Sequence, residues 1–142
     1  MNENVISADH KMNIKQSKYA TGKRKTSIAK VWLSKGSGKI IINGKNYDQY
    51  FKRANHKMQL LRPFEIINQQ TDFDVKCSVK GGGLTGQVGA MVHGISKALL
   101  QFDSNLKPTL KKEKLTTRDS RAVERKKYGH RKARRSFQFS KR

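Results

Sequence analysis

A glycine-rich segment has the spacing in this sequence that comes nearest to a ligand-binding motif. Residues 81–86 fit G-x-G-x-x-G and lie between a strand-like and a helix-like segment, which is the context of a dinucleotide-binding loop. That loop also requires a second parallel strand ending in an acidic residue about 20 positions on, but Asp103 is followed by Pro108 and a lysine run. We therefore favour two other interpretations. The glycines allow a sharp turn with close helix–strand packing, or their N–H groups and Lys80 bind a phosphate of a polynucleotide.

Other reactive side chains give little support for catalysis. The ten carboxylates are scattered, and the closest pair, Asp72 and Asp74, is typical of a solvated strand edge. Cys77 lies on the apolar side of its segment and is expected to be a small core residue. The four histidines do not have the spacing of metal ligands; they are His10, His56, His93 and His130. His93 is expected on the polar side of a helix, at the surface or facing RNA. We predict a protein that is not an enzyme and that uses no metal or cofactor.

Basic side chains dominate the C-terminal part of the sequence. Residues 125–142 contain nine Lys or Arg and no carboxylate, and the whole chain has a net charge of +22. Such a segment does not collapse on itself, but phosphates would neutralise it. Tyr128, Phe137 and Phe139 are interleaved with the cations and could stack on bases. The pattern favours RNA or DNA as the partner, held by phosphate contacts rather than base readout.

Composition limits the remaining classes. A single cysteine excludes an internal disulfide and suits a reducing compartment. No apolar stretch approaches the roughly 20 residues that span a bilayer, so we expect no membrane association. Residues 1–17 form a polar extension without the features of a secretion signal or transit peptide. The chain fits one domain with appendages.

Periodicity predicts the elements that position these groups. Segments 26–33 and 40–42 read as strands, and Asn43-Gly44 reads as a tight turn, so 26–44 is predicted to be a hairpin. Segments 47–51 and 55–61 look helical, with Pro63 limiting the second. Residues 73–80 alternate strictly and predict a strand with one apolar face. A long helix is predicted from about residue 85, and its apolar stripe consists of Leu84, Val88, Met91, Val92, Ile95, Leu99 and Phe102.

Four regions follow from these elements. Residues 1–17 are the polar extension, and residues 18–107 are expected to form a globular α+β RNA-binding domain. Residues 108–127 are expected to be a short helical basic segment, with helices near 108–115 and 118–127. Residues 128–142 are expected to be an extended basic tail.

Several separated motifs resemble one known family. The motifs are Tyr19-Ala20-Thr21-Gly22-Lys23-Arg24-Lys25-Thr26, Asn43-Gly44 with Tyr50-Phe51, Val79-Lys80-Gly81-Gly82-Gly83-Leu84-Thr85-Gly86-Gln87, His93-Gly94-Ile95, Thr117-Arg118-Asp119-Ser120-Arg121, Glu124-Arg125-Lys126-Lys127 and Ser140-Lys141-Arg142. In order and spacing, residues 18–142 are similar to the bacterial type of the ninth protein of the small ribosomal subunit. Because many motifs match together, the resemblance is far more specific than any one of them.

The resemblance implies a fold and a role. The fold is α+β, with a four-stranded mixed sheet backed by helices, similar to the second domain of the fifth small-subunit protein, and with a long extended basic C-terminal tail. The role is that of a structural constituent in the head of the small subunit. In this family the tail passes through ribosomal RNA toward the peptidyl (P) site, so the resemblance implies contacts of Ser140, Lys141 and Arg142 with P-site transfer RNA.

The partners expected on this basis are small-subunit ribosomal RNA, P-site transfer RNA and neighbouring ribosomal proteins, without a small-molecule substrate. The location expected is the cytoplasmic ribosome, in preference to the mitochondrial matrix. A free histone-like DNA- or RNA-binding protein is the alternative, and an enzyme using the glycine loop is the third hypothesis. The expected ribosomal RNA contacts are Lys23, Arg24, Lys25, Lys80, Gly82, Gly83, Arg118, Arg121, Arg125, Lys126, Lys127, Arg131, Lys132, Arg134 and Arg135.

Overall fold

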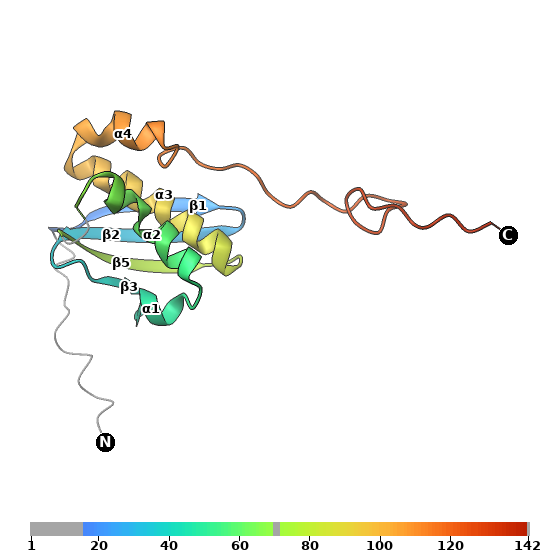
Figure 1. The fold of residues 1–142 in the computed structure, drawn as a ribbon, viewed down its shortest axis with the longest axis horizontal. Coiled ribbons are helices and arrows are strands. Elements are labelled where there is room, and N and C mark those ends of the chain that lie inside the picture. Colours follow the sequence, from blue (N-terminus) through green and yellow to red (C-terminus); the bar gives the residue numbers. More distant parts are fainter. Residues whose placement is uncertain (1–15, 70–71, 142) are drawn as a thin grey trace, which may run out of the picture.

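The computed structural model describes residues 16–69 and 72–141. The elements in chain order are β1 (Lys18–Arg24), β2 (Ser27–Lys35), β3 (Ile40–Ile42), β4 (Lys45–Asn46), α1 (Tyr47–Tyr50), α2 (Ala54–Ile66), β5 (Phe73–Lys80), α3 (Leu84–Phe102), the 3-10 turn η2 (Ser104–Leu106) and α4 (Lys107–Lys112). Figure 1 shows α2 and α3 packed on the sheet, and the segment after α4 leading away from the domain. The α+β class is confirmed, with helices backing a mixed sheet.

The sheet has five strands in the order β1-β2-β5-β3-β4, rather than the four that were expected. The additional strand is β4, which has two residues and pairs with β3 through the Asn43-Gly44 turn. Both turn residues have positive φ, 49° and 81°, as the predicted tight turn requires. Only the β3–β5 pair is parallel, and its crossover contains α1 and α2, because parallel neighbours need a long connection.

The predicted hairpin over residues 26–44 is wrong, because β5 lies between β2 and β3 and pairs with both. Asp74 holds the β2–β3 connection in place. Its Oδ1 accepts the N–H groups of Ser37 at 2.8 Å and Lys39 at 2.9 Å, and the carbonyl of Asp72 accepts the N–H of Gly36. Asp74 is buried, so the expectation of a solvated carboxylate is wrong for Asp74, although Asp72 is exposed as expected.

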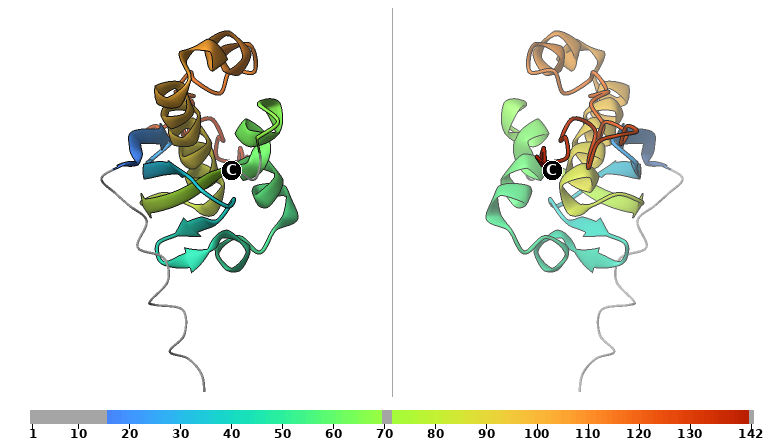
Figure 2. Two further views of the ribbon diagram at one scale, coloured as in Figure 1. Left: turned by 90° about the vertical axis from the view of Figure 1, so that its left-hand side faces the viewer. Right: turned by 90° about the vertical axis from the view of Figure 1, so that its right-hand side faces the viewer.

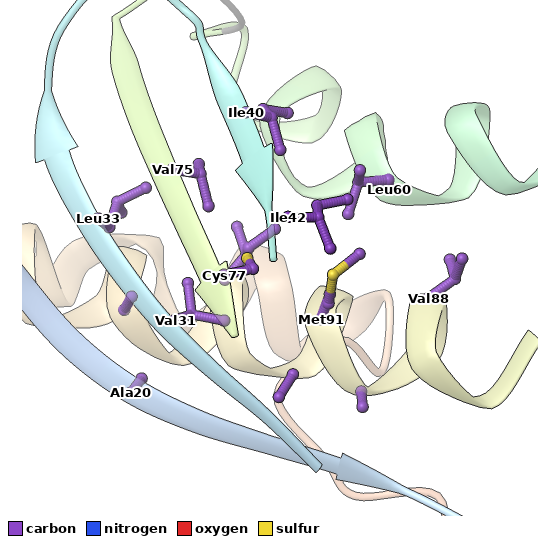
Figure 3. Close-up of a cluster of buried hydrophobic side chains, with 14 of the residues drawn as sticks. Ala20, Val31, Leu33, Ile40, Ile42, Leu60, Val75, Cys77, Val88 and Met91 are labelled. Carbon is purple, nitrogen blue, oxygen red and sulfur yellow. The ribbon is translucent and has the colours of Figure 1, made fainter. Parts of the chain in front are cut away.

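The core lies between the sheet and α3, as Figure 3 shows. Val88, Met91, Ile95 and Leu99 are fully buried, which confirms most of the predicted stripe. Leu84 is the exception at 47% exposed, because it is the first residue of α3 and lies beyond the strands. Cys77 is buried, and burial raises the pKa of its thiol to about 12, so it has the expected place of a small core residue.

Two glycines let β1 lie directly against α3. A Cβ on Gly22 would overlap the carbonyl oxygen of Ala90 and the backbone nitrogen of Gly94. A Cβ on Gly94 would lie 2.7 Å from a methyl group of Val31. The two backbones therefore approach more closely than any larger side chain would allow, and α3 is held over the first two strands.

Two predictions about helices are wrong, namely the end of α2 and the existence of a helix at 118–127. Helix α2 continues through Pro63 to Ile66, because Leu60 and Phe64 are buried one turn apart and their packing offsets the hydrogen bond that proline cannot make. The helical piece expected at 118–127 is absent, and in the described residues after α4 the structure has turns and an isolated bridge between His130 and Ser136. Asp119 explains part of this difference, because its carboxylate accepts the backbone N–H of Arg121 and caps a local turn.

Candidate nucleic-acid interface

The basic turn between β1 and β2 lies at one end of the domain. Lys25 has a positive φ of 52°, and the side chains of Lys23 and Lys25 are exposed. Arg24 is half-buried and extends along α3, since a Cβ on Gly89 would overlap its Cδ. Two cations of the triplet therefore face solvent, while the third lies against the domain.

The glycine loop packs against this turn. Gly81 and Gly82 have positive φ values of 75° and 62°, and the Ser27 hydroxyl donates a hydrogen bond to the Gly81 carbonyl at 3.1 Å. A Cβ on Gly82 would overlap the Ser27 oxygen, whereas a Cβ on Gly83 would meet nothing within 4 Å. The sharp turn and close packing are thus confirmed. The first turn of α3 and exposed Lys80 lie beside the basic turn as a result.

The dinucleotide-binding interpretation is wrong. Helix α3 is followed by η2 and α4, and among the described residues after it none joins the sheet. The loop therefore lacks the second parallel strand and its acidic residue, which would bind a ribose.

Asp119 connects the C-terminal segment to the domain. Its carboxylate receives both Nε, at 3.0 Å, and Nη2, at 2.8 Å, of Arg121, and it lies 3.3 Å from Nη2 of Arg24. Hydrogen bonds from the Arg121 side chain and backbone, in that order, hold the pKa of the Asp119 carboxyl well below its usual range. Asp119 therefore stays ionised at any ordinary pH. The sequence motif contained this residue, but its role as a tether was not predicted.

A depression of about 280 Å³ lies beside this tether, between α3 and the segment after α4. Its lining includes Lys23, Arg62, His93 and Arg121. His93 is only partly exposed, and its Nδ1 accepts the N–H of Lys23 at 3.3 Å. Burial, and then the charge of Lys97, lower the pKa of His93 below 6.5. His93 thus lies at the surface, as expected, and it also joins α3 to β1.

The tail residues are exposed, and some of them interact with one another. Glu124 pairs with Arg134 at 3.0 Å and with Lys127 at 3.7 Å, and the loop that the Arg134 pair closes overlaps the one closed by the His130–Ser136 bridge. The guanidinium of Arg131 lies 5.4 Å from the Phe137 ring centre. Tyr128 is 97% and Phe139 88% exposed, so both rings are available to a partner.

The structure therefore divides the predicted RNA contacts into two groups. Near one end of the domain it brings together Lys23, Arg24, Lys25, Lys80, Gly82, Gly83 and Arg121. Outside that cluster, exposed on the segment after α4, are Arg118, Arg125, Lys126, Lys127, Arg131, Lys132, Arg134 and Arg135. Ser140 and Lys141 are exposed near the far end of the tail (Figure 1), and Arg142 lies outside the described residues.

An aromatic pair on the sheet was missed. Tyr19 and Trp32 are cross-strand partners with ring centres 5.3 Å apart. The sequence contained a sign of this pair, because Tyr19 precedes a segment whose apolar residues alternate as in a strand. Recognising 18–24 as β1 would have placed Tyr19 beside Trp32 on the face away from the helices.

Neither a membrane span nor a metal cluster is found in residues 16–69 and 72–141. None of their helices is both long and apolar enough to span a membrane. No cluster of three or more His, Cys, Asp or Glu side chains among them could hold a metal ion.

The sequence matches the model of a known protein family. The family model described as ribosomal protein S9/S16 matches residues 22–142, which include the basic turn, the glycine loop, the Asp119 tether and the tail.

Proposed function

Because the chain belongs to the ribosomal protein S9/S16 family, we propose that it is a structural constituent of the small-subunit head in cytoplasmic ribosomes. Its domain binds ribosomal RNA, and its tail contacts P-site transfer RNA through Ser140, Lys141 and Arg142. Neighbouring proteins of the head complete its surroundings. The observation that carries the proposal is that an exposed basic end of the domain lies where the Arg24–Asp119 contact holds the start of the basic tail. The tail then leads away from the domain (Figure 1).

The domain contact rests on charge and backbone geometry. Lys23, Lys25 and Lys80 are exposed around the start of α3, and Gly83 leaves open space in front of the first helical N–H groups. Backbone N–H groups at a helix start, with lysines beside them, favour a phosphate group. Because phosphates carry no sequence information, these contacts position the domain on folded RNA rather than read bases.

The tail contact rests on accessibility. Apart from the carboxylates of Asp119 and Glu124, the residues after 118 offer few internal partners for their cations. Arginine guanidinium groups can bridge two phosphate oxygens, and lysine supplies a more mobile point charge. Tyr128 and Phe139 can stack on unpaired bases. The tail thus replaces water and counterions between RNA strands on its way to the transfer RNA.

The role in the ribosome is tested by assembly. Small subunits reconstituted or purified with a tagged chain should retain it through a high-salt wash, because folded RNA surrounds both the domain and the tail. A free histone-like binder would be stripped as salt screens its phosphate contacts. Recovery of the chain in the ribosome-free fraction after the wash would contradict the proposal.

The tail contact is tested by deleting residues 140–142. We expect normal subunit composition, because the domain and the other tail cations remain, but weaker binding of transfer RNA at the P site. Each lost phosphate contact should reduce the salt slope of binding by roughly 0.7 for single-stranded RNA, and different transfer RNAs should be affected alike. The measurement is transfer RNA affinity at two salt concentrations, with a Lys111→Ala/Lys112→Ala variant as a control for lost charge elsewhere. Unchanged affinity at both salts would remove the P-site role.

A further inference from the structure

The sheet has a second face, opposite α2 and α3. Figures 1 and 2 show both helices on one side of the strands. Side chains that alternate with the buried ones point to the other side, and their register aligns them in rows across β1, β2 and β5. We call this surface the open face. Its first row is Tyr19, Trp32 and Lys76, its second row is Thr21, Lys30 and Ser78, and its third row is Lys23, Ile28 and Lys80.

An aromatic pair lies in the first row. The rings of Tyr19 and Trp32 are tilted by 46° rather than stacked on each other. Tyr19 is 43% exposed, and its hydroxyl accepts a hydrogen bond from the Thr21 hydroxyl at 3.0 Å, which keeps the ring lying along β1. Part of an aromatic surface is therefore presented to solvent in a fixed orientation.

Lysines lie on one side of this pair, and the row on its other side contains Ser34 and Asp74. Lys30 and Lys76 are exposed in the rows that contain or adjoin the rings, and Lys23 and Lys80 are exposed two rows away. The nearest carboxylate on these strands is Asp74, whose Oδ1 is occupied by two backbone N–H groups of the β2–β3 connection. Charge on the open face is thus positive, which suits a polyanion better than a protein surface of mixed charge.

We propose that the open face binds an unpaired segment of RNA, with a base stacked on Tyr19 and Trp32 and flanking phosphates held by Lys30 and Lys76. Partners within a row lie about 4.8 Å apart, and neighbouring rows lie about 6.6 Å apart, because two residues of about 3.3 Å separate them along each strand. Aromatic and cationic groups therefore lie within one or two nucleotides of each other. Duplex RNA keeps its bases stacked internally, whereas unpaired bases can be received by aromatic side chains on a sheet. The inference rests on the proposed RNA-binding function and adds to it a stacking site that lies outside the basic motifs.

The only tryptophan of the chain supplies the probe. Because Trp32 is unique, fluorescence excited where tryptophan alone absorbs reports the open face and is insensitive to tail binding. A short unpaired oligoribonucleotide added to the full chain should quench Trp32, whereas inorganic polyphosphate, which has charge but no bases, should not. Tyr19→Ala should raise the oligoribonucleotide concentration that gives half-maximal quenching about five- to hundred-fold, which is the range for losing one stacked base.

A matched pair of charge variants tests whether the RNA that quenches Trp32 is bound by the open face or by cations elsewhere on the chain. Lys30→Glu/Lys76→Glu should abolish quenching, while Lys111→Glu/Lys112→Glu, with the same change in charge on α4, should leave it largely intact. Circular dichroism verifies that both variants fold. RNA binding by fluorescence anisotropy without Trp32 quenching, or equal loss in the two variants, would overturn the proposal. Quenching that appears only after deletion of residues 2–15 would show that this segment, and not RNA, occupies the open face in the full chain. That result would also overturn the proposal.

Assembled subunits separate this inference from the proposed function. Ultraviolet crosslinking should attach a nucleotide to Tyr19 or Trp32. A crosslink from either residue to another protein would assign the open face to a protein partner. In that case the chain would remain a ribosomal constituent retained through high salt, and only the stacking site would be lost.

Discussion

At the scale of single residues, the contact of Gly22 with α3 leaves no room for a side chain. The atoms that a Cβ would meet belong to the backbone of Ala90 and Gly94, so no side-chain rotation can make room. Gly83 provides the contrast, since nothing lies within 4 Å of its Cβ position and its φ is ordinary at −105°.

Gly22→Ala is therefore expected to destabilise the protein by about 3 kcal/mol or more, at the upper end of the range for overpacking. Gly83→Ala should change stability by only a few tenths of a kcal/mol. Urea unfolding of the two full-length variants, compared with the parent chain, measures the difference. Equal midpoints for Gly22→Ala and Gly83→Ala would show that β1 can move away from α3.

Residue roles that depend on a distant partner could not be predicted from the sequence. The expected burial of Cys77 was correct, because alternation along one strand identifies its face. The roles of Asp74 and Asp119 were not predicted, because a carboxylate in a loop or strand gives no sign of the N–H groups or guanidinium groups that will reach it. The contact of His93 with Lys23 was not predicted for the same reason, since it joins residues 70 positions apart.

At the scale of elements, long periodic segments were predicted best. Strand 73–80 and the helix near 85–102 were found because each repeats its period over several turns or pleats. Strand pairing was not, because β2 and β3 are close in sequence yet both pair with β5. Periodicity identifies the face of a strand but contains no information about its neighbour. Pro63 was taken as a stop because its local cost is visible in sequence, while the tertiary packing of Phe64 is not.

Stability should depend on the buried part of the α3 stripe. Leu99→Ala would leave a cavity in a fully buried site and is expected to cost about 2–5 kcal/mol. Leu84→Ala, the same change at the exposed start of the stripe, should cost about 0.5 kcal/mol or less. Ile95→Asp would bury a charge and should prevent folding. Denaturant unfolding of the Leu variants tests the prediction, and similar losses at positions 84 and 99 would contradict the core as described.

At the scale of the whole molecule, we expect the domain to stay folded without RNA and the tail to be disordered without it. The domain has its own core, whereas residues 125–141 are exposed along nearly their whole length. We expect backbone NMR of the free chain to show dispersed signals for residues 18–69 and 72–112. Signals for residues 129–141 should be narrow and poorly dispersed, because like charge opposes compaction. Adding RNA should broaden or shift the tail signals. Dispersed, rigid tail signals without RNA would contradict this prediction.

The position of β5 in the sheet has a consequence for synthesis of the chain. The central strand is made last, because β5 begins at Phe73, well after β2 has ended at Lys35. At a ribosomal rate of 5–20 residues per second, the nascent β2 and β3 wait about 2–8 seconds for their common partner. During that interval both have unsatisfied edges, which is when strands associate wrongly with other chains. Folding of the sheet is consequently a late, long-range event, which is complete only when β5 has paired with β2 and β3 and α3 has packed over the first two strands.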